Sequence, residues 1–234
     1  MNAPPPDLKR CQVKVCGIRE PAQAAALDAM GIDWIGFNFH PGSSRHVTAA
    51  AAAPQIRALR HARPVGVFVD AEIQFVIDVT RNTGITHVQL HGREDWEYVS
   101  RMPVPVIKAI PHTRLEDLGG LREPWERALR DGTGAGPLAY FLVDTQAGPG
   151  GASAFGGTGK TFDWSLLARN PPPLPYFLAG GLGPHNLAEA LPVCHAFAVD
   201  LNSKVEASPG SKDLDKVRAC LAMMDGYPAS DARS

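Results

Sequence analysis

Short apolar runs alternate with longer amphipathic stretches along most of the chain. Eight of these runs are rich in β-branched or aromatic residues and are mostly bounded by Gly, Pro or Asp, which is typical of buried parallel strands. They lie at residues 12–16, 33–39, 65–69, 86–90, 104–110, 139–144, 175–179 and 196–200. The pattern therefore predicts eight strands of a parallel sheet.

The stretches between these strands have helical features. Thr48 is a suitable N-cap for the Ala-rich segment that follows it, and Pro184 suits the first position of a helix. Helices are predicted at residues 21–30, 48–60, 72–83, 184–191 and 212–224. The glycine-rich residues 119–137 are interpreted as an extended connection between the fifth helix and the sixth strand.

Strands that alternate with helices form βαβ units, and eight such units predict a closed barrel. We expect one α/β domain, a (β/α)8 TIM barrel, over residues 12–224, with a flexible extension at 1–11 and a disordered tail at 225–234. A doubly wound open sheet is the main alternative, and a GxGxxG motif after the first strand would favour it. The sequence there is Cys16-Gly17-Ile18-Arg19, so the barrel is preferred.

Composition narrows the class of protein. The chain has 234 residues, 44% of them hydrophobic and 20% charged, with a net charge of −1, so a nucleic-acid surface is not expected. No apolar run approaches the ~20 residues that span a bilayer, and residues 1–9 do not resemble a signal peptide. The four cysteines form no CxxC pair and have no zinc spacing. We therefore expect a cytoplasmic protein without a membrane partner or a metal.

Candidate chemistry lies where the predicted strands end, because barrel enzymes carry their active sites there. The first strand ends in Cys16 and the sixth in Asp144. A thiolate can remove a carbon-bound proton, and a carboxylic acid can donate one. Lys14 shares a strand face with Cys16, and its ammonium would lower the pKa of the thiol. A small buried hydrophobe and a helix-capping aspartate are the ordinary alternatives for the two residues.

Two further sets of residues suit an anionic ligand. Gly180-Gly181 and Asn202-Ser203 follow the seventh and eighth strands, where barrels often bind phosphate through backbone N–H groups and a helix N-terminus. A simple tight turn is the alternative for the glycine pair. Arg45 follows the second strand and could hold a carboxylate, although an exposed loop arginine is the ordinary interpretation.

One apparent motif fails its own requirements. Residues 156–161 (GGTGKT) resemble a phosphate-binding GxxxxGK[ST] loop, but Ala154 occupies the position of the first glycine and no strand directly precedes the segment. We interpret residues 145–161 as a long, glycine-rich active-site lid.

Nine segments, in order over about residues 12–224, together resemble the phosphoribosylanthranilate isomerase family. They are KVCGI at 14–18, GFNFHP at 36–41 with Ser44-Arg45, VGVFV at 65–69, VQLHG at 88–92, VIKA at 106–109, Asp144-Thr145, GGTGKTFDW at 156–164, LAGGL at 178–182 and DLNSKVEASPG at 200–210. The chain departs from the family in its longer lid, and in Asn202 and Lys204, which replace residues that are more often Ser and Gly.

The resemblance implies a cofactor-free Amadori rearrangement in tryptophan biosynthesis, from phosphoribosylanthranilate to 1-(2-carboxyphenylamino)-1-deoxyribulose 5-phosphate. It implies that Cys16 is the general base, Asp144 the general acid and Arg45 the ligand of the anthranilate carboxylate. The other expected substrate-binding residues are Gly180, Gly181, Asn202 and Ser203 for the phosphate, with His91 and Asp200 lining the site. The expected partner is this phosphorylated amino-sugar substrate, and the chain is expected to be a monomer or a homodimer.

Two other classes of function stay open at this point. A different phosphate-binding barrel could be a Schiff-base aldolase that uses Lys108, or a metal-dependent epimerase that uses His91, Asp70 and Asp200. Loss of activity with EDTA would favour the epimerase. A nucleotide-binding module would depend on the incomplete motif, and ATP binding that Lys160→Ala abolished would support it.

Overall fold

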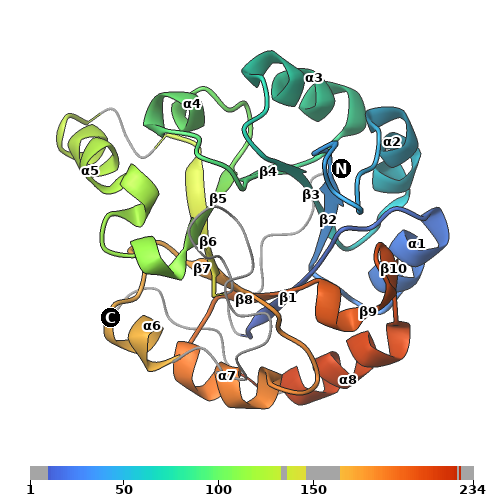
Figure 1. Ribbon diagram of the computed structural model, residues 1–234. Coiled ribbons are helices and arrows are strands. Elements are labelled where there is room, and N and C mark those ends of the chain that lie inside the picture. The colour runs from blue at the N-terminus through green and yellow to red at the C-terminus, as the bar shows by residue number, and fades with distance from the viewer. Residues whose placement is uncertain (1–9, 133–135, 146–163, 226, 228–234) are drawn as a thin grey trace.

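The computed structural model describes residues 10–132, 136–145, 164–225 and 227. Eight parallel strands close into a barrel in sequence order, and the helices form a ring around it (Figure 1). The strands are β1 (Gln12–Cys16), β2 (Trp34–Asn38), β3 (Arg63–Phe68), β4 (His87–Leu90), β5 (Val106–Pro111), β6 (Leu138–Asp144), β7 (Tyr176–Ala179) and β8 (Ala198–Leu201). The predicted TIM-barrel fold is therefore confirmed.

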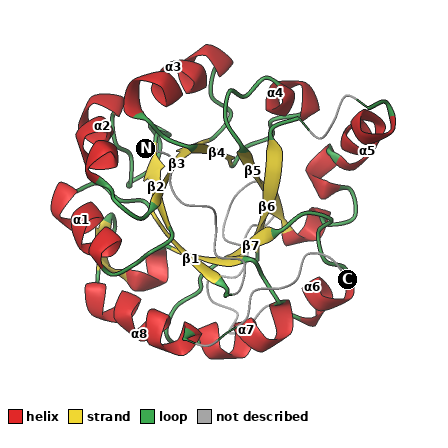
Figure 2. Ribbon diagram, turned by 180° about the vertical axis from the view of Figure 1, so that it is seen from behind, coloured by secondary structure: helices red, strands yellow, loops and turns green. Residues whose placement is uncertain are grey.

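Helices follow the strands on the outside of the barrel (Figure 2). They are α1 (Pro21–Ala29), α2 (Ala49–Ala58), α3 (Ile73–Thr83), α4 (Trp96–Ser100), α5 (Arg122–Arg130), α6 (Ser165–Arg169), α7 (Leu187–Cys194) and α8 (Leu214–Met224). Between β8 and α8 lie a 3-10 turn, η3 (Ser203–Val205), and a small hairpin of β9 (Glu206–Ser208) and β10 (Ser211–Lys212). None of the helices in the described ranges is long and apolar enough to cross a bilayer.

Some helices differ from the sequence prediction. The stretch 119–137 contains the helix α5, which is rich in charged residues and buries Trp125, so the stretch is not a plain connection. The helix α7 begins at Leu187, and Pro184 therefore lies before it and not at its first position. The N-cap prediction for α2 is confirmed, because the Thr48 hydroxyl accepts a hydrogen bond from the Ala51 N–H at 3.2 Å.

The two ends of the described chain meet next to the start of β1. Arg10 forms an ion pair with Asp33 at 2.6 Å, and Cys11 is buried. The Cys11 N–H donates to the Tyr227 carbonyl at 3.1 Å. Arg10 and Cys11 of the predicted extension and Tyr227 of the predicted tail thus contact the barrel or each other.

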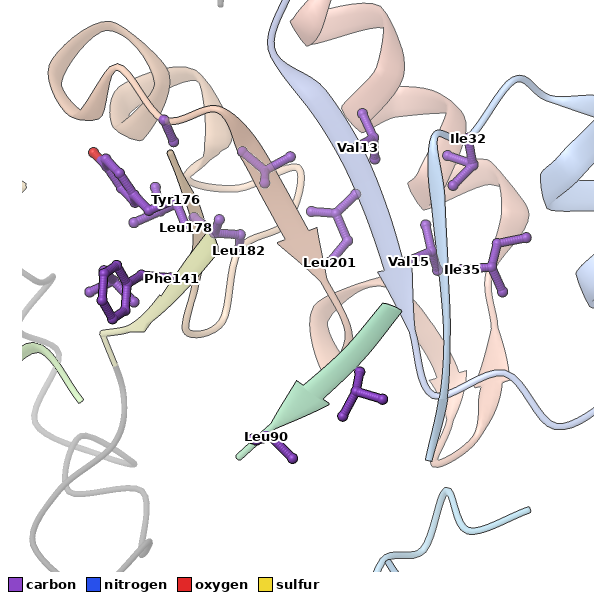
Figure 3. Packing of buried hydrophobic residues seen from close by; sticks show 14 of the residues in the cluster. Val13, Val15, Ile32, Ile35, Leu90, Phe141, Tyr176, Leu178, Leu182 and Leu201 are labelled. Atoms are coloured by element: carbon purple, nitrogen blue, oxygen red, sulfur yellow. The ribbon is translucent and has the colours of Figure 1, made fainter. Parts of the chain in front are cut away.

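The main hydrophobic cluster fills the space between the strands and the helices. Its strand residues alternate with residues that face the barrel interior, as the twofold period of a strand requires. Figure 3 shows part of this layer, including Val15 on β1, Ile35 on β2 and Leu178 on β7. All three side chains are fully buried.

A second cluster fills the barrel interior near the N-terminal ends of the strands, with Trp34 in its middle. The Trp34 ring lies edge-to-face with Phe177 at 5.3 Å and with Tyr140 at 5.7 Å between ring centroids. Its Nε1 donates to Gln12 Oε1 at 2.6 Å, so the indole N–H is satisfied. Arg63, at the start of β3, lies over the Trp34 ring at 4.9 Å, so this end combines aromatic and polar side chains.

Asp28 at the end of α1 organises the connection that leads into β3. Its carboxylate accepts hydrogen bonds from the backbone N–H groups of Arg60, His61 and Ala62 at 2.9, 3.0 and 2.7 Å. Burial opposes ionisation of this carboxyl group, but the three backbone hydrogen bonds outweigh it and lower its pKa. One carboxylate thus holds three backbone donors that would otherwise lose their partners.

We predict that Asp28→Ala lowers the free energy of unfolding by about 2–4 kcal/mol, because three hydrogen bonds to a charged group are lost and the buried Ala62 N–H is left unpaired. Denaturant unfolding measures the change. Asp78→Ala is the control, since Asp78 is exposed on α3 and accepts only from Gln74 at the surface. Equal stability of the Asp28 and Asp78 variants would contradict this role.

Candidate active site

Cys16 and Asp144 are the last residues of β1 and β6, so they lie at the same end of the barrel. Asp144 shares a strand face with Leu142, which belongs to the interior cluster. Cys16 likewise shares a face with Gln12, which bonds Trp34 inside the barrel. Both functional groups therefore point into the C-terminal mouth, which is the arrangement that a shared proton-transfer site needs.

The Cys16 thiol is 5% exposed, but charged groups surround it. Lys14, Asp200 and Lys212 all act electrostatically on the thiol. The facing strand gives it room, since a Cβ on Gly36 would lie only 2.8 Å from Cys16 Sγ. The thiol is thus buried next to charged side chains and not among apolar side chains alone.

Burial raises the pKa of Cys16, and the opposing pull of Lys14 is not enough to reverse it. Asp200 raises the pKa further, whereas Lys212 lowers it. Lys14 lowers the pKa of the thiol, as the sequence predicted, but the net shift is upward. The cause is that the desolvation of the thiolate destabilises it more than the nearby ammonium stabilises it.

Asp200, which was expected to line the substrate site, is held by Lys14. Lys14 Nζ donates to Asp200 Oδ1 at 2.9 Å, and both side chains are buried. Asp200 is the residue of β8 that pairs with Lys14 of β1 in the sheet register. The ion pair thus lies across the seam where the first and last strands meet.

His91, which was expected to line the site, lies beside Asp144. His91 Nε2 is 3.7 Å from Asp144 Oδ2, and His91 Nδ1 is 2.9 Å from the Gln89 amide nitrogen. Gln89, which sequence reasoning missed, thus contacts the histidine on the ring edge away from the carboxylate.

Arg45 is held by a partner that the sequence did not indicate. Its Nε and Nη2 donate to Glu206 at 2.8 and 2.6 Å. Its aliphatic stem crosses Gly17, where a Cβ would lie 2.6 Å from Arg45 Cδ. Because Gly17 follows Cys16 directly, this crossing brings the arginine next to the thiol, and the two groups interact electrostatically.

The loops after β7 and β8 come together beside β1, because β8 pairs with β1 in the barrel. Gly180 and Gly181 follow β7 with φ angles of 105° and 74°, and Asn202 leads into η3. A Cβ on Gly183 would lie 2.8 Å from Lys204 Cβ, so the two loops touch. The four residues expected to bind phosphate therefore lie on adjoining loops.

The residues that an aldolase or an epimerase would need are bound to other groups of the protein. Lys108 is 2% exposed and is bound by Glu94 Oε2 at 2.8 Å and by the Gly92 carbonyl at 2.7 Å, so its amine is not presented to the mouth. Asp70 pairs with Arg93, and Asp200 pairs with Lys14. The ligand set of an epimerase is thus not assembled.

No group of three His, Cys, Asp or Glu side chains within the described ranges could hold a metal ion. Residues 146–163 lie outside those ranges. The predicted lid at 145–161, apart from Thr145, and Lys160 of the incomplete motif therefore lie outside the described residues.

Comparison with known proteins agrees with this geometry. The sequence profile of the N-(5'-phosphoribosyl)anthranilate (PRA) isomerase family matches residues 13–222. The chain belongs to this family. It is 37% identical to the N-(5'-phosphoribosyl)anthranilate isomerase of Microcystis aeruginosa over 92% of this chain and 98% of that one.

Solved structures of the isomerase family share the fold. The phosphoribosyl anthranilate isomerase of Thermotoga maritima is 33% identical, with a TM-score of 0.76 over 93% of this chain and 100% of that one. Another family structure was solved in complex with reduced 1-(o-carboxyphenylamino)-1-deoxyribulose 5-phosphate; it is 31% identical, with a TM-score of 0.71 over 93% of this chain and 100% of that one.

Glu206 and Lys212 are the charged residues of this isomerase-family site that sequence reasoning passed over. Glu206 lies inside the segment 200–210 that carried the family resemblance, so that segment was the only signal for it. Nothing in their spacing relates either residue to Arg45.

We predict that Cys16 is a neutral thiol at neutral pH, because burial raises its pKa. The ultraviolet absorbance of the thiolate, taken as the difference between wild type and Cys16→Ser over a pH titration, should grow only in alkaline solution. Cys220→Ser provides the control, since burial raises the pKa of Cys220 to about 11. A Cys16 thiolate signal at neutral pH would show that the cations outweigh burial.

Proposed function

We propose that this chain converts N-(5-phosphoribosyl)anthranilate to 1-(2-carboxyphenylamino)-1-deoxyribulose 5-phosphate, the Amadori rearrangement of tryptophan biosynthesis. The observation that carries the proposal is the placement of a thiol and a carboxyl group, Cys16 and Asp144, at one end of a closed barrel with an arginine beside the thiol. A base and an acid at one mouth suit a reaction that consists of proton transfers.

Asp144 would act first, as the general acid. It would protonate the ring oxygen of the ribose, so that the bond from this oxygen to C1′ breaks and the anilino nitrogen forms a Schiff base with C1′. His91 Nε2, at 3.7 Å from Asp144 Oδ2, would keep the carboxyl group directed toward the substrate. The carboxyl of Asp144 is partly exposed, with 23% of its side chain accessible, so a substrate can reach it.

Cys16 would act second, as the general base. Its thiolate would remove the proton from C2′, and the electron pair would move toward the Schiff base to give an enolamine. The enolamine becomes the ketone as its hydroxyl loses a proton and C1′ gains one. A raised thiol pKa makes the thiolate scarcer and also a stronger base, and Lys14 beneath it favours the anion.

Two anion-binding regions would hold the substrate across these groups. Arg45 would bind the anthranilate carboxylate, and the adjoining loops with Gly180, Gly181, Asn202 and Ser203 would bind the phosphate. The proximity of Arg45 to the thiol and of the β7 loop to the β8 loop supports this orientation. The steps move protons only, so the reaction as written requires no metal or organic cofactor.

We predict that Cys16→Ala and Asp144→Asn each lower kcat by about 10²–10⁴-fold, the usual contribution of a positioned base or acid. Steady-state turnover of the aminoribosyl substrate measures the loss. Cys220→Ala is the matched control, because Cys220 is equally buried but lies on α8 among the helices. Near-normal turnover in the Cys16 variant would remove the proposed base.

A chelator separates this proposal from the metal-dependent alternative. Treatment with EDTA should leave the turnover of the wild-type protein unchanged. Loss of activity on chelation, restored by a divalent cation, would contradict the proton-transfer mechanism.

A further inference from the structure

Glu206 is a buried carboxylate at the start of the β9–β10 hairpin, with 5% of its side chain exposed. It accepts four hydrogen bonds from three residues. Arg45 donates through Nε at 2.8 Å and through Nη2 at 2.6 Å, Lys212 Nζ donates at 2.7 Å, and the Gly210 N–H donates at 3.1 Å. Both carboxylate oxygens are therefore held by donors of the protein itself.

The electrostatics keep this carboxylate charged. Burial opposes its ionisation, but hydrogen bonds from Arg45 and Lys212 outweigh burial and lower the pKa of Glu206 to about 2. Glu206 is thus an anion at neutral pH. One negative charge faces two buried or half-buried cations, so one positive charge remains uncompensated by Glu206.

The way in which Glu206 binds Arg45 determines which guanidinium donors stay available. A guanidinium group has one side-on pair of donors, Nε and one Nη, and one end-on pair, the two Nη atoms. Glu206 occupies the side-on pair of Arg45. The end-on pair is what is left for a second carboxylate, and the crossing of the Arg45 stem over Gly17 directs the group to the neighbourhood of Cys16.

The same network reaches the other anion-binding region. Lys212 Nζ donates to Asn202 Oδ1 at 3.0 Å and to the Asn202 carbonyl at 3.3 Å. The hairpin is fixed against α1, where Gln23 bonds both Ser211 Oγ and the Lys212 N–H at 3.1 Å. Glu206 consequently links the arginine after β2 to the loop after β8.

We propose that Glu206 is a positioning residue that fixes Arg45 with its end-on donors toward the substrate, and so makes the site selective for a substrate whose aromatic ring carries a carboxylate. This inference rests on the proposed function. It assigns selectivity to a residue that does not touch the substrate. A guanidinium without Glu206 would rotate about its side-chain bonds and lose the geometry that a bidentate contact needs.

Binding of a matched pair of ligands tests the inference. The first ligand is reduced 1-(o-carboxyphenylamino)-1-deoxyribulose 5-phosphate, and the second is the same compound without the ring carboxyl group. We expect wild type to bind the first ligand more tightly, and Glu206→Gln to reduce that preference on the order of 10- to 100-fold. Calorimetric titration gives both dissociation constants, and affinity for the second ligand should change little.

Control variants separate positioning from general damage. Glu123→Gln removes a carboxylate that also pairs with an arginine, Arg127, but at the surface of α5, and it should leave the preference intact. In an Arg45→Met background, Glu206→Gln should have no further effect on the preference, since Glu206 acts through Arg45. If Glu206→Gln does not fold, Glu206→Asp keeps the charge but is too short to hold both Arg45 nitrogens, and it should lower the preference in the same direction.

The outcomes are distinct. An unchanged ratio of the two dissociation constants in folded Glu206→Gln or Glu206→Asp would overturn the inference, and so would an equal loss of affinity for both ligands. A wild-type protein that binds neither ligand would instead overturn the proposed function.

Discussion

A buried ion pair between Lys14 and Asp200 joins the first and last strands of the barrel directly beneath the Cys16 thiol. The two residues are register partners, so the strand pairing that closes the barrel also brings their charges together at 2.9 Å. A buried pair of this kind costs much desolvation free energy, and a hydrophobic pair of the same size is often as stable. Its value here is local, because it places a cation under a thiol that must carry charge to act.

The charges around the mouth form two linked groups with different tasks. Lys14 and Asp200 set the electrostatic environment of Cys16 from below. Arg45, Glu206 and Lys212 form the second group at the side, and Lys212 reaches both groups because it also acts on the thiol. The aromatic rings around Trp34 fill the opposite end, where Arg63 lies over the indole.

The sequence predicted the fold well because its signals were local. Each strand carries a short apolar run, and Thr48 caps its own helix. The five-residue helices α4 and α6 were missed because they are too short to show a helical period, and α5 because its residues are mostly polar. The start of α7 differed because Pro184 is compatible with a turn as well as with a helix.

The candidate site was predicted in part. Residues at strand ends could be found, since barrel topology places all of them at one end. Their partners could not, because Lys14 and Asp200 are 186 residues apart and Arg45 and Glu206 are 161 apart, and only closure of the barrel relates them. The upward net shift of the Cys16 pKa could not be predicted for a similar reason, since neither burial nor Asp200 is visible along a single strand.

The most direct test of this account is the pH dependence of kcat/KM for wild type and Asp200→Asn. Asp200 raises the pKa of Cys16, and asparagine keeps the shape and an acceptor for Lys14 while removing the negative charge. The account predicts that kcat/KM of wild type rises with pH as the thiolate forms, and that the rise moves to lower pH in Asp200→Asn. An unmoved rise, or one displaced to higher pH, would contradict the role of the Lys14–Asp200 pair in setting the base.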